Sequence, residues 1–218
     1  MKLLIISDTH GKHLEISPKY VSNPNNDIST IICCGDISTR GYRHEIVYFL
    51  DWYSKLPFKN KILIAGNHDF YFERAPLDDI SKLLSEYPSI IYLNDSGVEI
   101  DGIKFWGSPV TPYFYNWAFN RLGTDICPHW DMIPSDTQVL ITHGPIRGYL
   151  DRTIKGDYAG CPYLLEKVVS LKNLSISCWG HIHEAYGIFK LADGKTLVNA
   201  SVLDEKYEVV NKPIEIEI

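Results

Sequence analysis

The chain has 218 residues, of which 45% are hydrophobic and 22% are charged, and its formal net charge is −6. This length and composition fit one compact α/β domain that spans residues 1–218 and buries a sizeable core. The acidic balance argues against long duplex nucleic acid as a partner, and no stretch is long and apolar enough to cross a membrane.

Short apolar runs, each followed by a polar cluster that contains glycine, predict strands buried on both faces. Helical spacing or a proline-led start predicts helices between them. In chain order, the prediction is strand 2–6, strand 29–34, helix 42–56, strand 61–65, helix 75–87, strand 138–141, helix 161–173, strand 174–179, a hairpin in 186–201 and a strand in 211–218. Asp193-Gly194 marks the hairpin, and the alternating tail suits a sheet edge with an acidic outer face.

Residues 108–136 are rich in aromatic residues and proline and show little periodicity. Long ordered loops are uncommon and usually functional, so this segment is interpreted as an aromatic insertion over one end of the sheet. Its aromatic side chains could form a stacking wall for a nucleobase or aryl group, or could pack the insertion onto the domain. They are Tyr113, Phe114, Tyr115, Trp117 and Phe119, with Asn116 and His129 as polar neighbours that could face a cleft.

Five cysteines occur without paired metal-type spacing. Cys33 and Cys34 lie in an apolar run and are interpreted as reduced core thiols. Reduced thiols predict a reducing compartment, most simply the cytoplasm.

Five polar clusters follow the predicted strands, at the place where α/β proteins bind ligands. Together they contain Asp8, His10, Asp36, Asn67, His68, His143, His181 and His183. His181 and His183 are two residues apart, so in an extended segment both imidazoles point the same way. Alone they could be surface histidines on a loop. However, five of the eight histidines lie in the clusters that follow predicted strands, which is unlikely to occur by chance.

Imidazole, carboxylate and one amide, with no cysteine in the clusters, form a borderline-to-hard ligand set. Such a set suits Mn²⁺, Fe, Zn²⁺ or Ni²⁺. Seven candidate ligands are too many for one ion, since a catalytic Zn²⁺ takes about three protein ligands. They are about right for two ions that share a bridging carboxylate.

The motifs "D-x-H" at 8–10, "GD" at 35–36, "GNHD" at 66–69, "HG" at 143–144 and "GHIH" at 180–183 occur in this order. This ordered set resembles the calcineurin-like metallophosphoesterase superfamily across nearly the whole chain. "WGSP", "NWAFNR", "THGPIRGYLD" and "GHIHEAYG" look like its MPPED-like phosphodiesterase branch. The resemblance implies a two-sheet β-sandwich flanked by helices, an αββα fold with its active site at the C-terminal ends of the strands.

The resemblance also implies residue roles and two divalent transition-metal ions, most simply Mn²⁺, with Fe, Zn²⁺ or Ni²⁺ as alternatives. Asp8, His10 and His183 would hold the first metal, Asp36 would bridge both, and Asn67, His143 and His181 would hold the second. Gly180 would let the backbone approach the site closely. His68 would face the leaving-group oxygen and donate a proton, and Asp69 would either orient it or pack elsewhere.

One departure concerns "GDISTRG", which resembles the protein-phosphatase motif "GDxxDRG" but has Thr39 in place of the second aspartate. The missing carboxylate weakens the protein-phosphatase interpretation, because His68 would need another partner. Arg40 could bind a phosphate oxygen bidentately or form a surface ion pair. Further cationic side chains are possible substrate contacts or solvated surface: Arg121, Arg147, Arg152 and Lys155.

The leading hypothesis is a dinuclear phosphoesterase that hydrolyses phosphodiesters by attack of a metal-bridged hydroxide. A cyclic nucleotide, a nucleotide diester and a nucleic-acid end are candidate substrates, and short or single-stranded nucleic acid stays open. Alternatives are a phosphomonoesterase or protein phosphatase and, less favoured because every ligand is present, a non-catalytic adaptor on the same fold. The sequence indicates neither the physiological substrate nor the oligomeric state.

Overall fold

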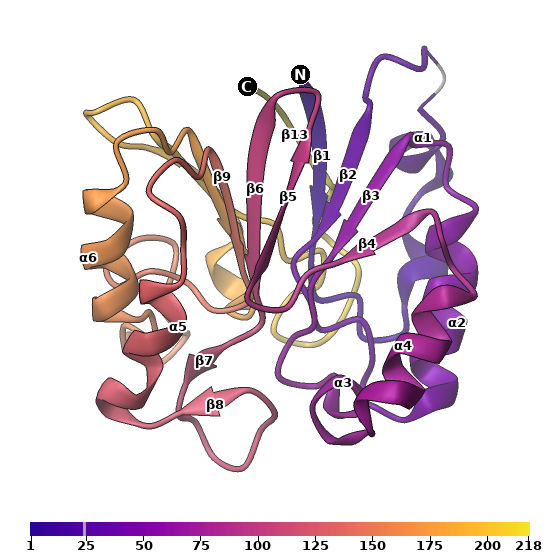
Figure 1. The fold of residues 1–218 in the computed structure, drawn as a ribbon, viewed down its shortest axis with the longest axis horizontal. Helices are drawn as coiled ribbons and strands as arrows, with labels where there is room; N and C mark the ends of the chain where they lie inside the picture. The colour runs from indigo at the N-terminus through magenta and orange to yellow at the C-terminus, as the bar shows by residue number, and fades with distance from the viewer. Residues whose placement is uncertain (24) are drawn as a thin grey trace.

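The computed structural model describes residues 1–23 and 25–218, in which two main sheets pack against each other (Figure 1). The first sheet has the order β13-β1-β2-β3-β4, with β1 to β4 parallel and β13 antiparallel at one edge. Its strands are β1 (Lys2–Ile6), β2 (Thr30–Cys33), β3 (Asn60–Leu63), β4 (Ile90–Tyr92) and β13 (Ile214–Glu217).

The second sheet has the order β11-β12-β10-β9-β6-β5, in which β12, β10, β9 and β6 are parallel and the two outer strands are antiparallel. Its strands are β5 (Ser96–Ile100), β6 (Ile103–Ser108), β9 (Val139–Thr142), β10 (Ile176–Trp179), β11 (Gly187–Lys190) and β12 (Thr196–Asn199). A small parallel pair, β7 (Thr111–Pro112) and β8 (Asn120–Arg121), lies below this sheet (Figure 1).

Helices cover the outer face of each sheet, as Figure 1 shows. Beside the first sheet lie α1 (Pro18–Val21), α2 (Arg43–Ser54), α3 (Phe70–Arg74) and α4 (Leu77–Ser85), and beside the second lie α5 (Cys127–Asp131) and α6 (Pro162–Ser170). Short 3₁₀ turns are η1 (His13–Glu15), η2 (Gly123–Ile126) and η3 (His183–Ala185). None of the helices in the described residues has the length and hydrophobicity needed to span a bilayer. The layering confirms the predicted αββα fold.

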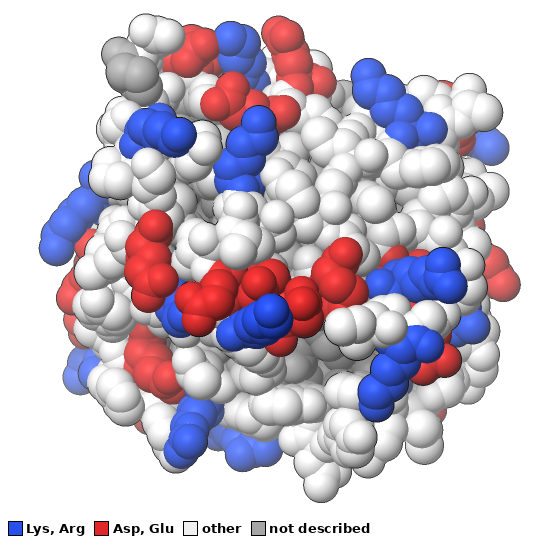
Figure 2. All heavy atoms as spheres, turned by 180° about the vertical axis from the view of Figure 1, so that it is seen from behind, with Lys and Arg blue, Asp and Glu red and all other residues white. Residues whose placement is uncertain are grey.

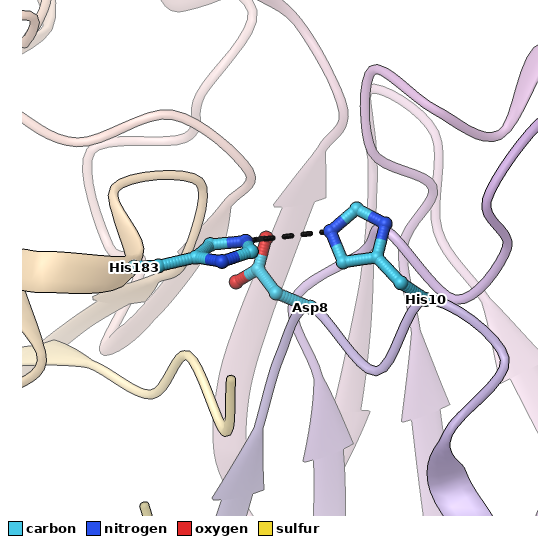
Figure 3. Close-up of side chains that lie close together, drawn as sticks. All are labelled: Asp8, His10 and His183. Atoms are coloured by element: carbon cyan, nitrogen blue, oxygen red, sulfur yellow. Dashed lines mark hydrogen bonds and ion pairs between the residues drawn. The ribbon is translucent and has the colours of Figure 1, made fainter. Parts of the chain in front are cut away.

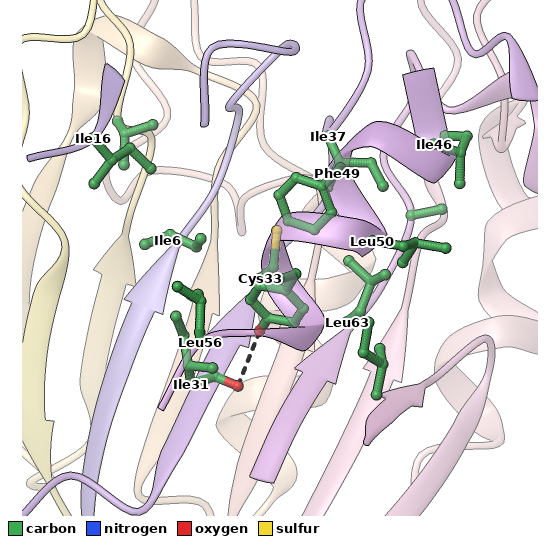
Figure 4. Close-up of a cluster of buried hydrophobic side chains, with 14 of the residues drawn as sticks. Ile6, Ile16, Ile31, Cys33, Ile37, Ile46, Phe49, Leu50, Leu56 and Leu63 are labelled. Carbon is green, nitrogen blue, oxygen red and sulfur yellow. Dashed lines mark hydrogen bonds between the residues drawn. The ribbon is translucent and has the colours of Figure 1, made fainter. Parts of the chain in front are cut away.

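The apolar runs are continuous because both faces of each central strand are buried. In β1, Leu3 and Ile5 face the layer between the sheets, whereas Leu4 and Ile6 face the helices. Figure 4 shows the helix side of this core, where α2 packs Ile46, Phe49 and Leu50 onto the first sheet. Burying one such side chain stabilises the fold by about 1.5–3 kcal/mol, so the strands hold the loops at their ends firmly.

The predicted strands and helices are present with shifts of a few residues at their ends. The predicted hairpin is β11–β12, and the alternating tail is the edge strand β13. Within residues 108–136, for which no regular element was predicted, Ser108 ends β6 and the segment contains β7, β8, η2 and α5. The prediction also omitted β4, β5 and β6. All five cysteines are free. Cys33, the last residue of β2, and Cys34, which follows it, are buried in the cores on opposite sides of the first sheet.

Candidate metal centre

Five strands end at the same side of the molecule, and the loop after each one carries candidate ligands. These strands are β1, β2, β3, β9 and β10. The ligand side chains are buried except for those of His68 and His181, which are partly exposed. Within each of two groups the donor atoms lie within 4.8 Å of one another: Asp8, His10 and His183 form the first group, and Asp36, His143 and His181 form the second. A third such group, His10, Asp36 and His68, overlaps both.

The first group joins Asp8, His10 and His183, as Figure 3 shows. The Nε2 atoms of His10 and His183 lie 3.3 Å apart, and Asp8 Oδ1 lies 3.6 Å from Nε2 of His183. Nδ1 of His10 lies 3.1 Å from the carbonyl oxygen of Ser38, and Nδ1 of His183 lies 2.9 Å from that of Asp204. A carbonyl can only accept, so each Nδ1 carries a proton, and each Nε2 directs a lone pair at the group when its ring is neutral. Two facing lone pairs beside a carboxylate fit a metal cation.

The second group is built in the same way around His143, whose side chain is fully buried. Its Nδ1 lies 2.8 Å from the carbonyl oxygen of Cys34, and its Nε2 lies 2.8 Å from Oδ1 of Asn67 and 3.3 Å from Oδ2 of Asp36. The ring of His181 lies edge-on to that of His143, with 5.1 Å between centroids. Nitrogen and oxygen donors without a thiolate suit a divalent transition metal here too.

Asp36 lies between the two groups. Its Oδ2 is 3.3 Å from Nε2 of His143 and 3.7 Å from Nε2 of His10, while its Oδ1 accepts the amide hydrogen of His68 at 2.8 Å. The residue is 2% exposed. One carboxylate therefore faces imidazoles of both groups, which is the arrangement that a bridging ligand needs.

The four buried or half-buried histidines of the two groups fall into two electrostatic pairs. For His143 and His183, burial alone would lower the pKa, but the aspartate of the same group outweighs it and raises the pKa to about 9. For His10 and His181, burial dominates and lowers the pKa to about 4. A metal ion binds neutral imidazole, so a cation that enters must displace protons from the first pair, whereas the second pair is ready to bind.

Four of the candidate ligands adopt left-handed backbone conformations, which side-chain-bearing residues rarely populate. The φ angles are 55° for Asp8, 40° for His10, 51° for Asp36 and 69° for His181. Such conformations persist only where the surroundings enforce them, and they cluster at functional sites. Here the amides of Asp8 and His10 donate to carbonyl oxygens of the loop after β2, each at 3.0 Å, which locks the two loops together.

Gly180 is required by a close approach to the first group. The amide of His181 donates to both carboxylate oxygens of Asp8 at 3.0 Å, and a Cβ at Gly180 would collide with Asp8 Oδ2 and with Ser7. We therefore expect Gly180→Ala to displace the Asp8 carboxylate and to weaken Mn²⁺ binding about 10–100-fold, as loss of ligand support does elsewhere. Isothermal titration with Mn²⁺ measures this change.

Gly144→Ala is the matched control, because its Cβ would come no closer than 3.2 Å to a side-chain atom of Thr111. Its Mn²⁺ affinity should stay near that of the wild type. Equal affinities in Gly180→Ala and Gly144→Ala would contradict the role of Gly180.

His68 is held by the backbone and by the aromatic segment. Its Nδ1 lies 2.8 Å from the carbonyl oxygen of Thr39, so that nitrogen donates and Nε2 stays available. The Thr39 carbonyl thus replaces the carboxylate of the protein-phosphatase motif as the partner of His68. Trp117 stacks on the His68 ring at 4.1 Å and 26°, and the ring of His10 lies 4.6 Å away.

The aromatic segment is attached to the site rather than laid loosely over it. The amide of Ala118 donates to the carbonyl oxygen of Asn67 at 3.1 Å, and the amide of Phe119 donates to Glu73 at 2.7 Å. Phe119 is buried, which fits the packing interpretation, and Trp117 lies on His68. Three aromatic side chains stay exposed and available for stacking: Tyr113, Phe114 and Tyr115.

The remaining candidates lie outside the buried groups. Asp69 accepts hydrogen bonds from the Gly66 amide and from the Ser38 hydroxyl, at 2.8 and 2.6 Å, so it ties two loops together instead of orienting His68. Arg40, Arg147 and Asn116 are exposed at the surface.

His129 is engaged in a network of its own. Its Nδ1 donates to Asp95 at 2.7 Å, and its Nε2 accepts from Arg121 at 3.0 Å.

Sequence reasoning missed Tyr207, whose ring contacts the rings of both His10 and His183. No motif marks it, because it reaches the site through a turn far along the chain.

Comparisons with known proteins point to one family. Residues 1–185 match the family model described as calcineurin-like phosphoesterase. The chain is 36% identical over 239 aligned positions to human metallophosphoesterase domain-containing protein 1, covering 100% of this chain and 71% of the relative.

Two solved structures share the fold. A dimetal phosphatase from Danio rerio has a TM-score of 0.56 at 11% identity, over 91% of this chain and 86% of the other. A novel archaeal phosphodiesterase has a TM-score of 0.52 at 18% identity, over 99% of each chain. At these identities the likeness concerns the fold alone.

Proposed function

The chain belongs to the calcineurin-like phosphoesterase family, and from that membership and the site geometry we propose that it is a dinuclear metal-dependent phosphodiesterase. The observation that carries the proposal is the position of Asp36, whose carboxylate faces imidazoles of two ligand groups. Asp8, His10 and His183 would hold one ion, and Asn67, His143 and His181 the other, with Asp36 shared.

Two bound divalent ions, most simply Mn²⁺, would supply an activated water and neutralise charge on the phosphoryl oxygens. The chain itself holds the ligands: backbone carbonyls orient His10, His143 and His183 so that each Nε2 faces inward. Fe, Zn²⁺ and Ni²⁺ suit the same donors.

His68 is the proposed proton donor to the leaving group. Its Nδ1 is bound to the Thr39 carbonyl, its ring is fixed by Trp117, and its side chain is partly exposed beside the buried ligands. As an imidazolium, this fixed ring keeps its Nδ1 proton on the Thr39 carbonyl, passes its Nε2 proton to the departing alkoxide and becomes neutral.

The charge of the site supports a diester over a monoester. Among the described buried residues, the lysines and arginines are Lys61 and Lys195, and each of their ammonium groups is bound elsewhere, to Phe58 or to Asp193. A phosphate monoester dianion carries two negative charges and is usually bound by arginine. A phosphodiester carries one negative charge and needs less neutralisation. The exposed Arg40, Arg147 and Asn116 are proposed as outer substrate contacts.

The test compares Mn²⁺-reconstituted protein on bis(p-nitrophenyl) phosphate and p-nitrophenyl phosphate. We expect kcat/KM to favour the diester by about 10-fold or more, equivalent to about 1.4 kcal/mol of transition-state stabilisation. A clear monoester preference would support the phosphomonoesterase or protein-phosphatase alternative. Fewer than one bound transition metal per chain under replete conditions would instead support a non-catalytic adaptor.

The surface charge narrows the natural substrate. On the face shown in Figure 2, acidic side chains form a band and the basic ones are dispersed around it. A duplex-binding surface needs clustered lysine and arginine, and the formal net charge of −6 also opposes one, so long duplex nucleic acid is disfavoured. Cyclic nucleotides, nucleotide diesters and nucleic-acid ends are the substrate classes to profile.

The free buried cysteines support a reducing compartment such as the cytoplasm.

A further inference from the structure

Tyr207 lies against two ligands of the first metal group. Its ring centroid is 4.9 Å from that of His10 and 5.1 Å from that of His183, edge-on to both, and the two imidazole centroids are 5.3 Å apart. The tyrosine is 43% exposed, whereas His10 is 6% and His183 is 8% exposed. Tyr207 is therefore the outermost of three mutually contacting rings, and it covers the histidine pair on that side.

A short turn holds Tyr207 in place. The amide of Tyr207 donates to the carbonyl oxygen of Asp204, and the amide of Asp204 donates to that of Glu208, both at 2.9 Å. The Asp204 carboxylate accepts the amides of Lys206 and Glu208, also at 2.9 Å. The same Asp204 carbonyl accepts Nδ1 of His183, so one turn both orients a ligand and delivers the ring that covers it.

The backbone of Tyr207 is in the left-handed region, with φ at 62°. This conformation suits glycine or asparagine and is strained for a bulky residue. A strained aromatic residue that contacts two candidate ligands is better explained by a role at the site than by turn formation. The turn also lies beyond residues 1–185, the part that matches the family model.

We propose that Tyr207 is a positioning residue for the first metal: its ring fixes the imidazoles of His10 and His183 for coordination and shields the bound ion from water. The inference rests on the proposed metal centre and is independent of which ester is hydrolysed. The ring carries the role, since both contacts are edge-to-face ring contacts, a favourable geometry for aromatic pairs.

Three variants test this inference through metal binding. Tyr207→Ala removes the ring, Tyr207→Phe removes only the hydroxyl, and Tyr207→Gly removes the ring while relieving the backbone strain. The control is Tyr48→Ala, because Tyr48 is also half-exposed, at 49%, and also covers a buried histidine, His13, with ring centroids 4.6 Å apart. Thermal unfolding of the metal-free proteins checks that each variant folds.

The readouts are Mn²⁺ affinity by isothermal titration and the rate at which a chelator removes bound Mn²⁺. We expect Tyr207→Ala and Tyr207→Gly to weaken one of two Mn²⁺ affinities about 10–100-fold and to speed metal loss. Tyr207→Phe and Tyr48→Ala should match the wild type.

Wild-type metal binding in folded Tyr207→Gly would overturn the inference. So would an equal loss in Tyr207→Phe, because the hydroxyl would then carry the effect, or in Tyr48→Ala. If the wild type binds two ions but hydrolyses neither test ester, the proposed function fails and this inference stands. If the wild type binds no metal, both fail.

Discussion

Replacing Asp36 with asparagine is expected to lower kcat/KM for a phosphodiester by about 10³-fold or more, a loss of roughly 4 kcal/mol of transition-state stabilisation. The amide can keep its oxygen on the His68 amide, where Asp36 Oδ1 accepts a hydrogen bond at 2.8 Å. Its NH₂ group would then occupy the position of Oδ2, which faces His143 and His10. An NH₂ group has no lone pair for a metal, so the shared ligand and one negative charge are lost together.

Asp151→Asn is the matched control for Asp36→Asn. Asp151 is also a buried carboxylate, 1% exposed, and its Oδ2 accepts the amides of Gly148 and Gly160 at 2.9 and 3.0 Å. Its replacement should cost stability but leave metal stoichiometry unchanged. Full diesterase activity in Asp36→Asn would remove Asp36 from its bridging role.

Replacing His68 with alanine is expected to lower kcat by about 10²–10⁴-fold while both metal ions stay bound, the range typical of a lost general acid. The effect should grow as the leaving group becomes more basic. An alkyl leaving group needs the proton, whereas p-nitrophenolate departs without it. Rates for a series of aryl and alkyl phosphodiesters measure this dependence.

Elemental analysis of the same variant separates two roles for His68. The side chain also lies in a donor group with His10 and Asp36, so it could instead bind a metal. Loss of one ion in His68→Ala would identify a ligand, and a rate loss independent of the leaving group would exclude proton donation. His44→Ala, an exposed histidine on α2, serves as the control and should leave both properties unchanged.

The central strands were predictable because burial on both faces leaves a continuous apolar run, as in β1 and β2. Strand β4 has an apolar run of three residues, Ile90–Tyr92, which is shorter than the usual strand signal, and β5 and β6 lack a continuous apolar run. In β5, burial differs from residue to residue and only Ile100 is buried, so no apolar run forms. Asp101-Gly102, between β5 and β6, was an available hairpin signal.

The candidate ligands could be predicted from motifs because they act through their side chains. The groups that orient these ligands could not be predicted in this way. Ser38, Cys34 and Asp204 act through backbone carbonyls, which any residue type could supply. Tyr207 contacts His10 although the two residues lie near opposite ends of the sequence. The left-handed backbone of Tyr207 could not be predicted from its residue type.

The most direct measurement is electron paramagnetic resonance of the wild type titrated with Mn²⁺. A carboxylate shared by both ions predicts saturation at two ions per chain and the spectrum of an exchange-coupled pair, which Asp36→Asn should abolish. Saturation at a single ion, or the signal of isolated Mn²⁺ at full loading, would contradict a centre built around Asp36.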